Sequence, residues 1–218
     1  MKSDFVLIDG FEVPRFFYGT AWKEDRTQQL AELALEQGFR AIDTANQRRH
    51  YDEAAVGQAI ASAVSRGIVA RNDLFLQTKF TFQRGQDQRL PYDPKAPIAT
   101  QVERSFASSL EHLGLETIDS FLLHGPTLRE GLVADDWGAW RAMETVHDSG
   151  RVRMLGVSNV SRAQLEALVA KARIPPRSEN RAGAQASIIA IRGSIHARAS
   201  PLTAPDRSRR ARSSRAFK

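Results

Sequence analysis

Residues 118–125 read IDSFLLHG, an apolar run that ends in the polar side chain of His124. Similar short runs occur as FRAIDTA at 39–45, LFLQTKF at 74–80 and VRMLGV at 152–157. Short apolar runs of this kind, bounded by polar residues, predict buried β-strands. Between them, apolar residues recur at helical spacing, so the sequence predicts an alternation of strands and helices.

The alternation predicts five strand–helix units, in which each strand is followed by one amphipathic helix. The units span residues 16–37, 39–66, 74–113, 118–149 and 152–173. Repeated units of this kind form a parallel sheet that helices cover. Ahead of the first unit, two apolar runs at 5–8 and 11–13 flank Asp9-Gly10, which predicts an N-terminal β-hairpin.

Two parallel α/β architectures fit this order, namely a doubly wound open sheet and a (β/α)8 TIM barrel. A doubly wound dinucleotide-binding fold predicts a G-x-G-x-x-G turn, and the chain contains none. Polar residues instead follow the ends of the predicted strands, which is where a barrel opens its functional face. They are Asp43, Lys79, His124, and Ser158 with Asn159. We therefore predict an incomplete (β/α)8 barrel with about five to six units.

The composition narrows the class of protein. The chain has 218 residues, of which 42% are hydrophobic and 26% charged, as in ordinary soluble proteins. It contains no cysteine, which excludes disulfides and thiolate metal sites. The sequence has no apolar run of the roughly 18 residues that a membrane span needs, and no secretory signal, so we expect a cytoplasmic protein without a membrane partner. His, Asp and Glu also lack a metal-ligand spacing, which predicts no metal.

The positive charge is concentrated at the C-terminal end. Residues 177–218 carry ten basic and two acidic side chains, whereas residues 1–176 carry 21 basic and 23 acidic ones. We therefore expect a partial barrel over 1–176 that binds no nucleic acid, followed by a basic, low-complexity tail over 177–218. One hypothesis is that the tail is an out-of-frame translation product. The other is a natural basic arm that binds nucleic acid or other anionic surfaces through its charge.

The polar residues at the strand ends have a joint chemical interpretation. Asp43 and Lys79 would form an ion pair, because a buried lysine is costly without a partner. A tyrosine beside that lysine would have its pKa lowered from about 10 and could give a proton to a carbonyl oxygen. A nearby histidine could hydrogen-bond the same oxygen, and Ser158 with Asn159 could bind a carboxamide.

Five of these stretches also occur together in one known family. They are FYGTAW at 17–22, AIDTA at 41–45, LQTKF at 76–80, FLLHGP at 121–126 and GVSN at 156–159. In this order, over about residues 5–176, the chain resembles the aldo-keto reductases. The resemblance implies the reduction of an aldehyde or ketone, a small carbonyl substrate, to an alcohol with NADPH, or less often NADH. A non-catalytic remnant of such an enzyme and a charge-driven binder are the alternative hypotheses.

The resemblance also implies a role for each matching residue. Asp43 and Lys79 are the pair that tunes the acid, His124 positions the carbonyl, and Tyr51 is the general acid. In the cofactor site, Thr20 and Ala21 line the nicotinamide end, and Ser158 and Asn159 hold the carboxamide.

Two features depart from the family pattern. Tyr51 follows Asp43 by eight residues instead of the usual five, and counting back from Val56-Gly57 places His50 at the usual position. We choose Tyr51 because it is the phenol nearest to this position. The second departure is that the pattern stops near Pro176. A sixth strand with a nicotinamide-stacking glutamine, two further strands and a basic cofactor-binding loop are not recognisable after it.

Overall fold

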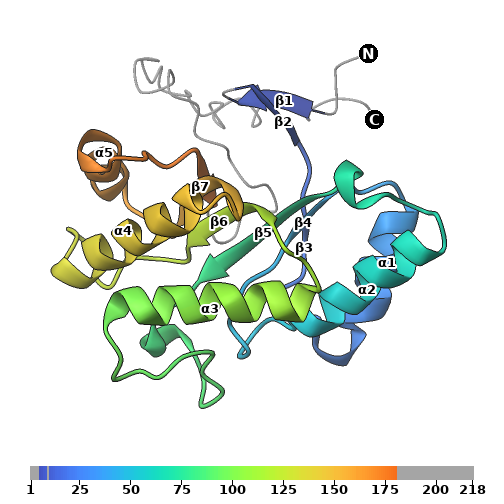
Figure 1. Ribbon diagram of the computed structural model, residues 1–218, viewed down its shortest axis with the longest axis horizontal. Helices are drawn as coiled ribbons and strands as arrows, with labels where there is room; N and C mark the ends of the chain where they lie inside the picture. Colours follow the sequence, from blue (N-terminus) through green and yellow to red (C-terminus); the bar gives the residue numbers. More distant parts are fainter. Residues whose placement is uncertain (1–4, 9, 181–218) are drawn as a thin grey trace, which may run out of the picture.

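A computed structural model of the chain describes residues 5–8 and 10–180 (Figure 1). The strands are β1 Phe5–Ile8, β2 Phe11–Pro14, β3 Tyr18–Gly19, β4 Ala41–Asp43, β5 Phe75–Phe80, β6 Ile118–Leu123, β7 Val152–Ser158 and β8 Ser178–Asn180. The α-helices are α1 Thr27–Glu36, α2 Glu53–Ser65, α3 Ile98–Leu113, α4 Ala134–Asp148 and α5 Arg162–Lys171. Short 3-10 helices span Glu24–Arg26, Arg71–Asp73 and Gln83–Gly85. The predicted alternation of strands and helices is confirmed.

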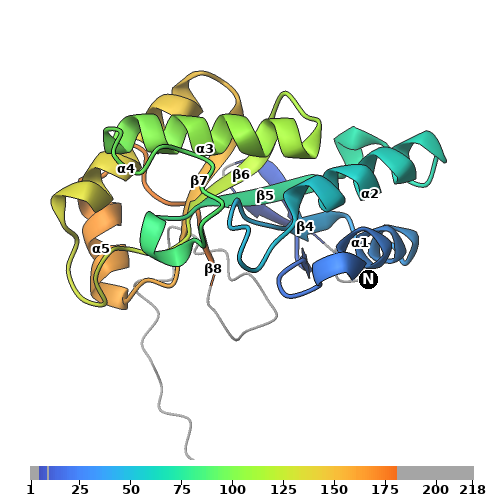
Figure 2. The same ribbon diagram turned by 90° about the horizontal axis from the view of Figure 1, so that it is seen from below.

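The main sheet has six parallel strands whose order in space follows the sequence, β3-β4-β5-β6-β7-β8. A strictly sequential order with right-handed crossovers places all the connecting helices on one face of the sheet. The sheet then curves into a barrel wall, whereas a doubly wound fold would reverse its strand order. Figure 2 shows the helices along the outside of this wall. Within the described residues the barrel is incomplete, because β3 and β8 are the outer strands.

Strand β8 is the sixth strand of the sheet and agrees with the predicted five to six units, although no strand was recognisable in the sequence after Pro176. Its residues pair in parallel with the end of β7, with Gly156 opposite Ser178 and Ser158 opposite Asn180. Ser178–Asn180 reads SEN and has no apolar residue, so the hydrophobic pattern gave no signal for it. Residues 181–218 hold most of the predicted basic tail and lie outside the described residues, so both hypotheses for the tail stay predictions.

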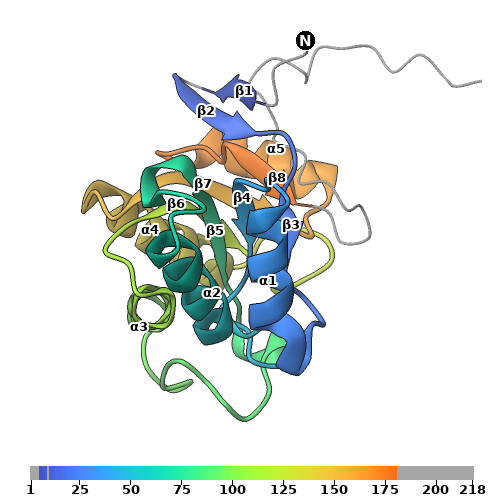
Figure 3. The same cartoon turned by 90° about the vertical axis from the view of Figure 1, so that its right-hand side faces the viewer.

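Two hydrophobic clusters fix the orientation of the barrel wall. The larger one fills the space between the sheet and the helices, and includes Phe106, Phe121 and Trp140. The smaller one joins the hairpin of β1 and β2 to the beginnings of the strands, through Ile8 and Val13 among others. The hairpin therefore covers the end of the sheet where the strands begin (Figure 3). None of the described helices is long and apolar enough to cross a membrane.

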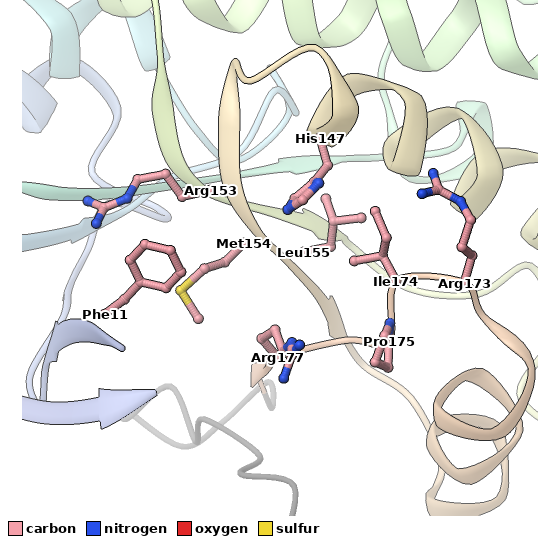
Figure 4. Close-up of a pocket in the computed structure, with 9 residues that line it drawn as sticks. All are labelled: Phe11, His147, Arg153, Met154, Leu155, Arg173, Ile174, Pro175 and Arg177. Atoms are coloured by element: carbon pink, nitrogen blue, oxygen red, sulfur yellow. The ribbon is translucent and has the colours of Figure 1, made fainter. Parts of the chain in front are cut away.

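A cavity of about 280 Å³ lies beside the hairpin, between β7 and the segment that leads to β8 (Figure 4). Its side chains include Phe11 and Arg153 on one side and Arg173 on the other. Arg153 pairs with Asp119 at 3.1 Å, and Arg173 pairs with Asp148 at 2.6 Å. This cavity is at the beginning of β7, away from the polar strand ends, and Arg153 and Arg173 already hold carboxylate partners.

The contact between α2 and α3 depends on one glycine. A Cβ atom on Gly57 would lie 2.3 Å from the His112 carbonyl oxygen and 2.9 Å from the Leu113 Cα. Backbone atoms cannot move aside cheaply, so this position requires glycine although it is inside a helix.

We expect Gly57→Ala to lower the free energy of unfolding by about 1–3 kcal/mol, because α2 must move away from α3. Urea denaturation measures the change. Gln58→Ala, at the next and exposed position of α2, is the matched control and should stay within about 0.5 kcal/mol. The close contact would be disproved by a Gly57→Ala protein stabilised by about 1 kcal/mol, which is the gain from helix propensity alone.

Candidate active site

Lys79 is the most deeply buried charged group at the strand ends, with 1% of its side chain exposed. Its ammonium nitrogen lies 2.7 Å from Oδ1 and 2.8 Å from Oδ2 of Asp43. It also donates a hydrogen bond to the Thr44 carbonyl at 2.8 Å. Lys79 comes from β5 and Asp43 from the end of β4, and the parallel pairing of these strands brings the two side chains together. The predicted ion pair is present.

Sequence reasoning missed the residues that support this pair. The Gln77 amide donates to Asp43 Oδ1 at 2.7 Å, and the Ser120 hydroxyl donates to Gln77 Oε1 at 3.0 Å. Gln77 and Lys79 are two apart on β5, so they point to the same face of the sheet. The sequence did contain a signal for Gln77. It is a polar residue two positions before Lys79, in a strand that is buried throughout.

Tyr51 lies in the loop between β4 and α2, just before Asp52, whose side chain caps α2. The centre of its ring is 5.0 Å from the Lys79 ammonium and 5.9 Å from the His124 ring, which it meets edge to face. The phenol predicted from sequence is therefore next to the ion pair and the histidine.

The expectation that the pKa of Tyr51 lies below 10 is wrong. Burial raises the pKa of the phenol, and this outweighs the charge and hydrogen bond of Lys79, which lower it. Asp43 opposes the lysine, because its negative charge also raises the pKa. Tyr51 is therefore protonated at neutral pH, with a cation beside it that would stabilise the phenolate once the proton leaves.

His124 directly follows β6, and its backbone N–H donates to the Phe80 carbonyl at 2.9 Å. The Thr81 hydroxyl lies 2.7 Å from the ring nitrogen Nδ1. Burial, together with the charge of Lys79, lowers the pKa of His124 to about 3, so the imidazole is neutral at physiological pH. When the Thr81 hydroxyl donates to Nδ1, the other ring nitrogen, Nε2, carries the hydrogen. Thr81 was not predicted, although it stands only two positions after Lys79.

Five residues were predicted to hold a cofactor, and four of them, besides Asp43, lie at or just after the ends of strands β3 and β7. Thr20 is buried and donates to the Asp43 carbonyl through its hydroxyl, at 3.1 Å, and through its backbone N–H, at 3.0 Å. Ala21 is the next residue and is partly buried. Ser158 is buried at the end of β7, and Asn159 follows it with a positive φ of 54°.

The hydrogen bonds of Asn159 define what this pair can offer a ligand. Its side-chain amide donates to the His124 carbonyl at 2.7 Å and to the Ser158 hydroxyl oxygen at 3.1 Å. Both amide hydrogens are thus used within the chain. The Asn159 side-chain oxygen remains as an acceptor and the Ser158 hydroxyl hydrogen as a donor, which is the complement of a carboxamide.

His50, the alternative acid by spacing, has a different environment. Its ring stacks on Trp22 with 3.6 Å between ring centres, and Trp22 keeps 66% of its surface exposed. Burial, with the charge of Arg49, lowers the pKa of His50. Its Nδ1 atom is buried and has no hydrogen-bond partner within the described residues. Tyr51, by contrast, has its ring directly beside Lys79.

A cavity of about 370 Å³ opens beside His124. The loop over residues 83–98 forms part of its wall through Arg84 and Gly85, and it is held to the site. The Tyr92 hydroxyl donates to the Thr81 carbonyl at 2.6 Å, and the Gln86 amide donates to the Asn46 carbonyl at 2.7 Å. These contacts place the loop at the site.

The residues that the structure describes include no group of three or more His, Asp or Glu side chains that could hold a metal ion. The chemistry available at the strand ends is therefore a buried cation, two neutral proton donors and a carboxamide-sized pair of polar groups.

Comparisons with known proteins identify the family of the chain. The profile of the Aldo/keto reductase family matches residues 16–180. The uncharacterized oxidoreductase YtbE of Bacillus subtilis is 31% identical over 179 residues, which cover 81% of this chain and 57% of that protein. Aldo-keto reductase AKR2E4 of Bombyx mori is 33% identical over 182 residues, covering 78% of this chain and 54% of that protein.

Solved structures of aldo-keto reductases also match the fold of this chain. The crystal structure of Bombyx mori AKR2E4 in complex with NADP superimposes with a TM-score of 0.67 at 30% identity, covering 80% of this chain and 56% of that one. Aldo-keto reductase AKR2E5, complexed with NADPH, gives a TM-score of 0.66 at 29% identity, covering 82% and 54% of the two chains. The chain spans about half the length of the relatives it matches. Because the family profile covers most of its residues, the chain belongs to the aldo/keto reductase family.

Proposed function

We propose that this chain is the acid–base part of a carbonyl reductase that converts an aldehyde or ketone to an alcohol with NADPH, or less often NADH. The convergence of Tyr51, His124 and the Lys79–Asp43 pair at neighbouring strand ends carries the proposal. Relatives crystallised with NADP and NADPH support the choice of cofactor. A reduced nicotinamide, when bound, supplies the hydride that the carbonyl carbon accepts.

Tyr51 is proposed as the general acid. Burial keeps its hydroxyl protonated, so it has a proton to give to the carbonyl oxygen as that oxygen gains charge. The phenolate that remains lies beside the Lys79 ammonium, which stabilises it, and Asp43 keeps that ammonium in place. One proton thus moves from the Tyr51 oxygen to the substrate oxygen, which completes the alcohol.

His124 is proposed to orient the same oxygen. A neutral imidazole whose Nδ1 contacts Thr81 can donate from Nε2, and such a donor strengthens as the carbonyl oxygen becomes negative. A protonated imidazole would compete with Tyr51 as the acid. The low pKa of His124 therefore separates the two roles.

Ser158 and Asn159 fit the carboxamide of a nicotinamide. The Ser158 hydroxyl can donate to the carboxamide oxygen, and the Asn159 side-chain oxygen can accept from its nitrogen. Because the Asn159 amide hydrogens are bound to His124 and Ser158, the orientation of its oxygen is fixed before any ligand arrives.

We expect Tyr51→Phe to reduce kcat for a generic aldehyde with NADPH by roughly 10²–10⁴-fold, because the general acid is lost. NADPH binding, followed by its fluorescence, should persist in this variant. Tyr18→Phe is the matched control, because the Tyr18 ring packs edge to face on Phe39, outside the site, and its loss of a hydroxyl should leave kcat unchanged. If Tyr51→Phe is fully active and His50→Phe is inactive, the general acid is His50 and not Tyr51. A chain that binds NADPH but reduces no aldehyde would be a non-catalytic remnant.

The low pKa of His124 predicts a pH-dependent stability. Between about pH 6.5 and 3 the unfolded chain binds a proton on this ring that the folded chain does not. Stability therefore falls as the pH falls below 6.5, and above 6.5 the ring has no such effect. The unfolding free energy of His124→Gln should fall less between pH 7 and 5 than that of the wild type. A wild-type His124 NMR signal that titrates near pH 6.5 would contradict this account.

A further inference from the structure

The cavity beside His124 has a distinctive charge. Residues that line it include Gln47, Thr81, Arg84, His124, Arg129 and Asn159. Among the described residues no acidic side chain lines the cavity, although it has two arginines and a neutral imidazole. Phe82 and Leu128 add apolar surface to the wall. The cavity therefore presents positive charge next to the group proposed to orient the carbonyl.

The two arginines have no carboxylate partner in the part of the chain that the structure describes. Arg84 donates one hydrogen bond to the Pro126 carbonyl, and a guanidinium has five N–H groups, so most of its donors remain. In the cavity beside the hairpin, by contrast, Arg153 and Arg173 pair with Asp119 and Asp148. The guanidinium groups of Arg84 and Arg129 are therefore available to a carboxylate in the cavity beside His124.

We propose that this cavity binds the anionic end of the substrate, and that the substrate is an aldehyde or ketone that carries a carboxylate. Its carbonyl would lie at His124 and its carboxylate at Arg84 and Arg129. The inference rests on the proposed function, because it takes His124 as the residue that orients the carbonyl. It goes further by naming the class of carbonyl compound.

The contact between Arg84 and Pro126 supports this assignment. It joins the 3-10 helix Gln83–Gly85 to the loop that follows His124, so the two walls of the cavity are tied together across its arginine side. The Gln47 amide donates to the Gly85 carbonyl at 2.7 Å and holds the same helix from the other side. An arginine fixed in this way loses less conformational freedom when it binds a carboxylate.

A phosphate of the cofactor is the competing source of negative charge. The geometry favours the substrate, because an occupant of this cavity contacts His124, the residue proposed to orient the carbonyl. The experiment separates the two sources with a carboxylate probe and a phosphate probe.

The test compares 4-carboxybenzaldehyde with benzaldehyde, using the full chain and NADPH at low ionic strength. We expect wild type to prefer the carboxylate substrate in kcat/KM. Arg129→Gln should reduce this preference about tenfold, since a charge-assisted hydrogen bond is lost. Arg84→Gln should act in the same direction, and Arg129→Lys should keep much of the preference. Arg104→Gln, at an exposed arginine on α3, is the matched control and should leave both substrates unaffected.

A second readout does not depend on turnover. Binding of 4-(hydroxymethyl)benzoate, followed by NMR saturation transfer, should exceed that of benzyl alcohol and should weaken in Arg129→Gln. If both binding results are observed but no aldehyde is reduced, the anion site is supported and the proposed function is wrong. Equal binding of the two alcohols, or no preference between the aldehydes, overturns the anion site. Arginine variants that weaken binding of 2′,5′-ADP but keep the substrate preference also overturn it, in favour of a cofactor phosphate.

Discussion

A lysine with 1% of its side chain exposed cannot remain charged in a barrel wall without compensation, and Asp43 supplies that compensation. The pairing requires β4 and β5 to be neighbours in parallel register, with Asp43 opposite Gln77. Gln77 then binds the carboxylate from the same strand as the lysine. The sequential strand order and the ion pair therefore depend on each other, and the remaining site residues are arranged around this pair.

The charge of Lys79 lowers the pKa of both of its neighbours, His124 and Tyr51. It lowers the pKa of His124, in addition to burial, and so keeps the imidazole neutral. It lowers the pKa of Tyr51 only partly, because burial raises it more. The result is two uncharged donors beside one buried cation. Such a site can polarise an oxygen, protonate it and then hold the resulting Tyr51 phenolate beside the Lys79 ammonium.

The main helices and strands were predictable because apolar runs and helical spacing are strong signals. Asp43, Lys79 and His124 were predicted as site residues because each lies at the end of a predicted strand. Spacing alone favoured His50, and only the three-dimensional arrangement distinguishes it from Tyr51. Arg84 and Arg129 lie in loops, which have no periodicity that would predict their shared cavity. The predicted shift of the Tyr51 pKa had the wrong direction. The sequence identifies the nearby charge of Lys79, but it does not show how deeply the phenol is buried.

The central claim is that the Lys79–Asp43 pair lowers the proton affinity of Tyr51 below the value that burial alone would give it. The most direct measurement is an NMR titration of the Tyr51 ring carbon in the wild type and in the Asp43→Asn, Lys79→Met double variant, which removes both charges together. The stronger effect of Lys79 predicts a higher Tyr51 pKa in the double variant. A Tyr51 pKa that is unchanged or lower in the folded double variant would contradict the account.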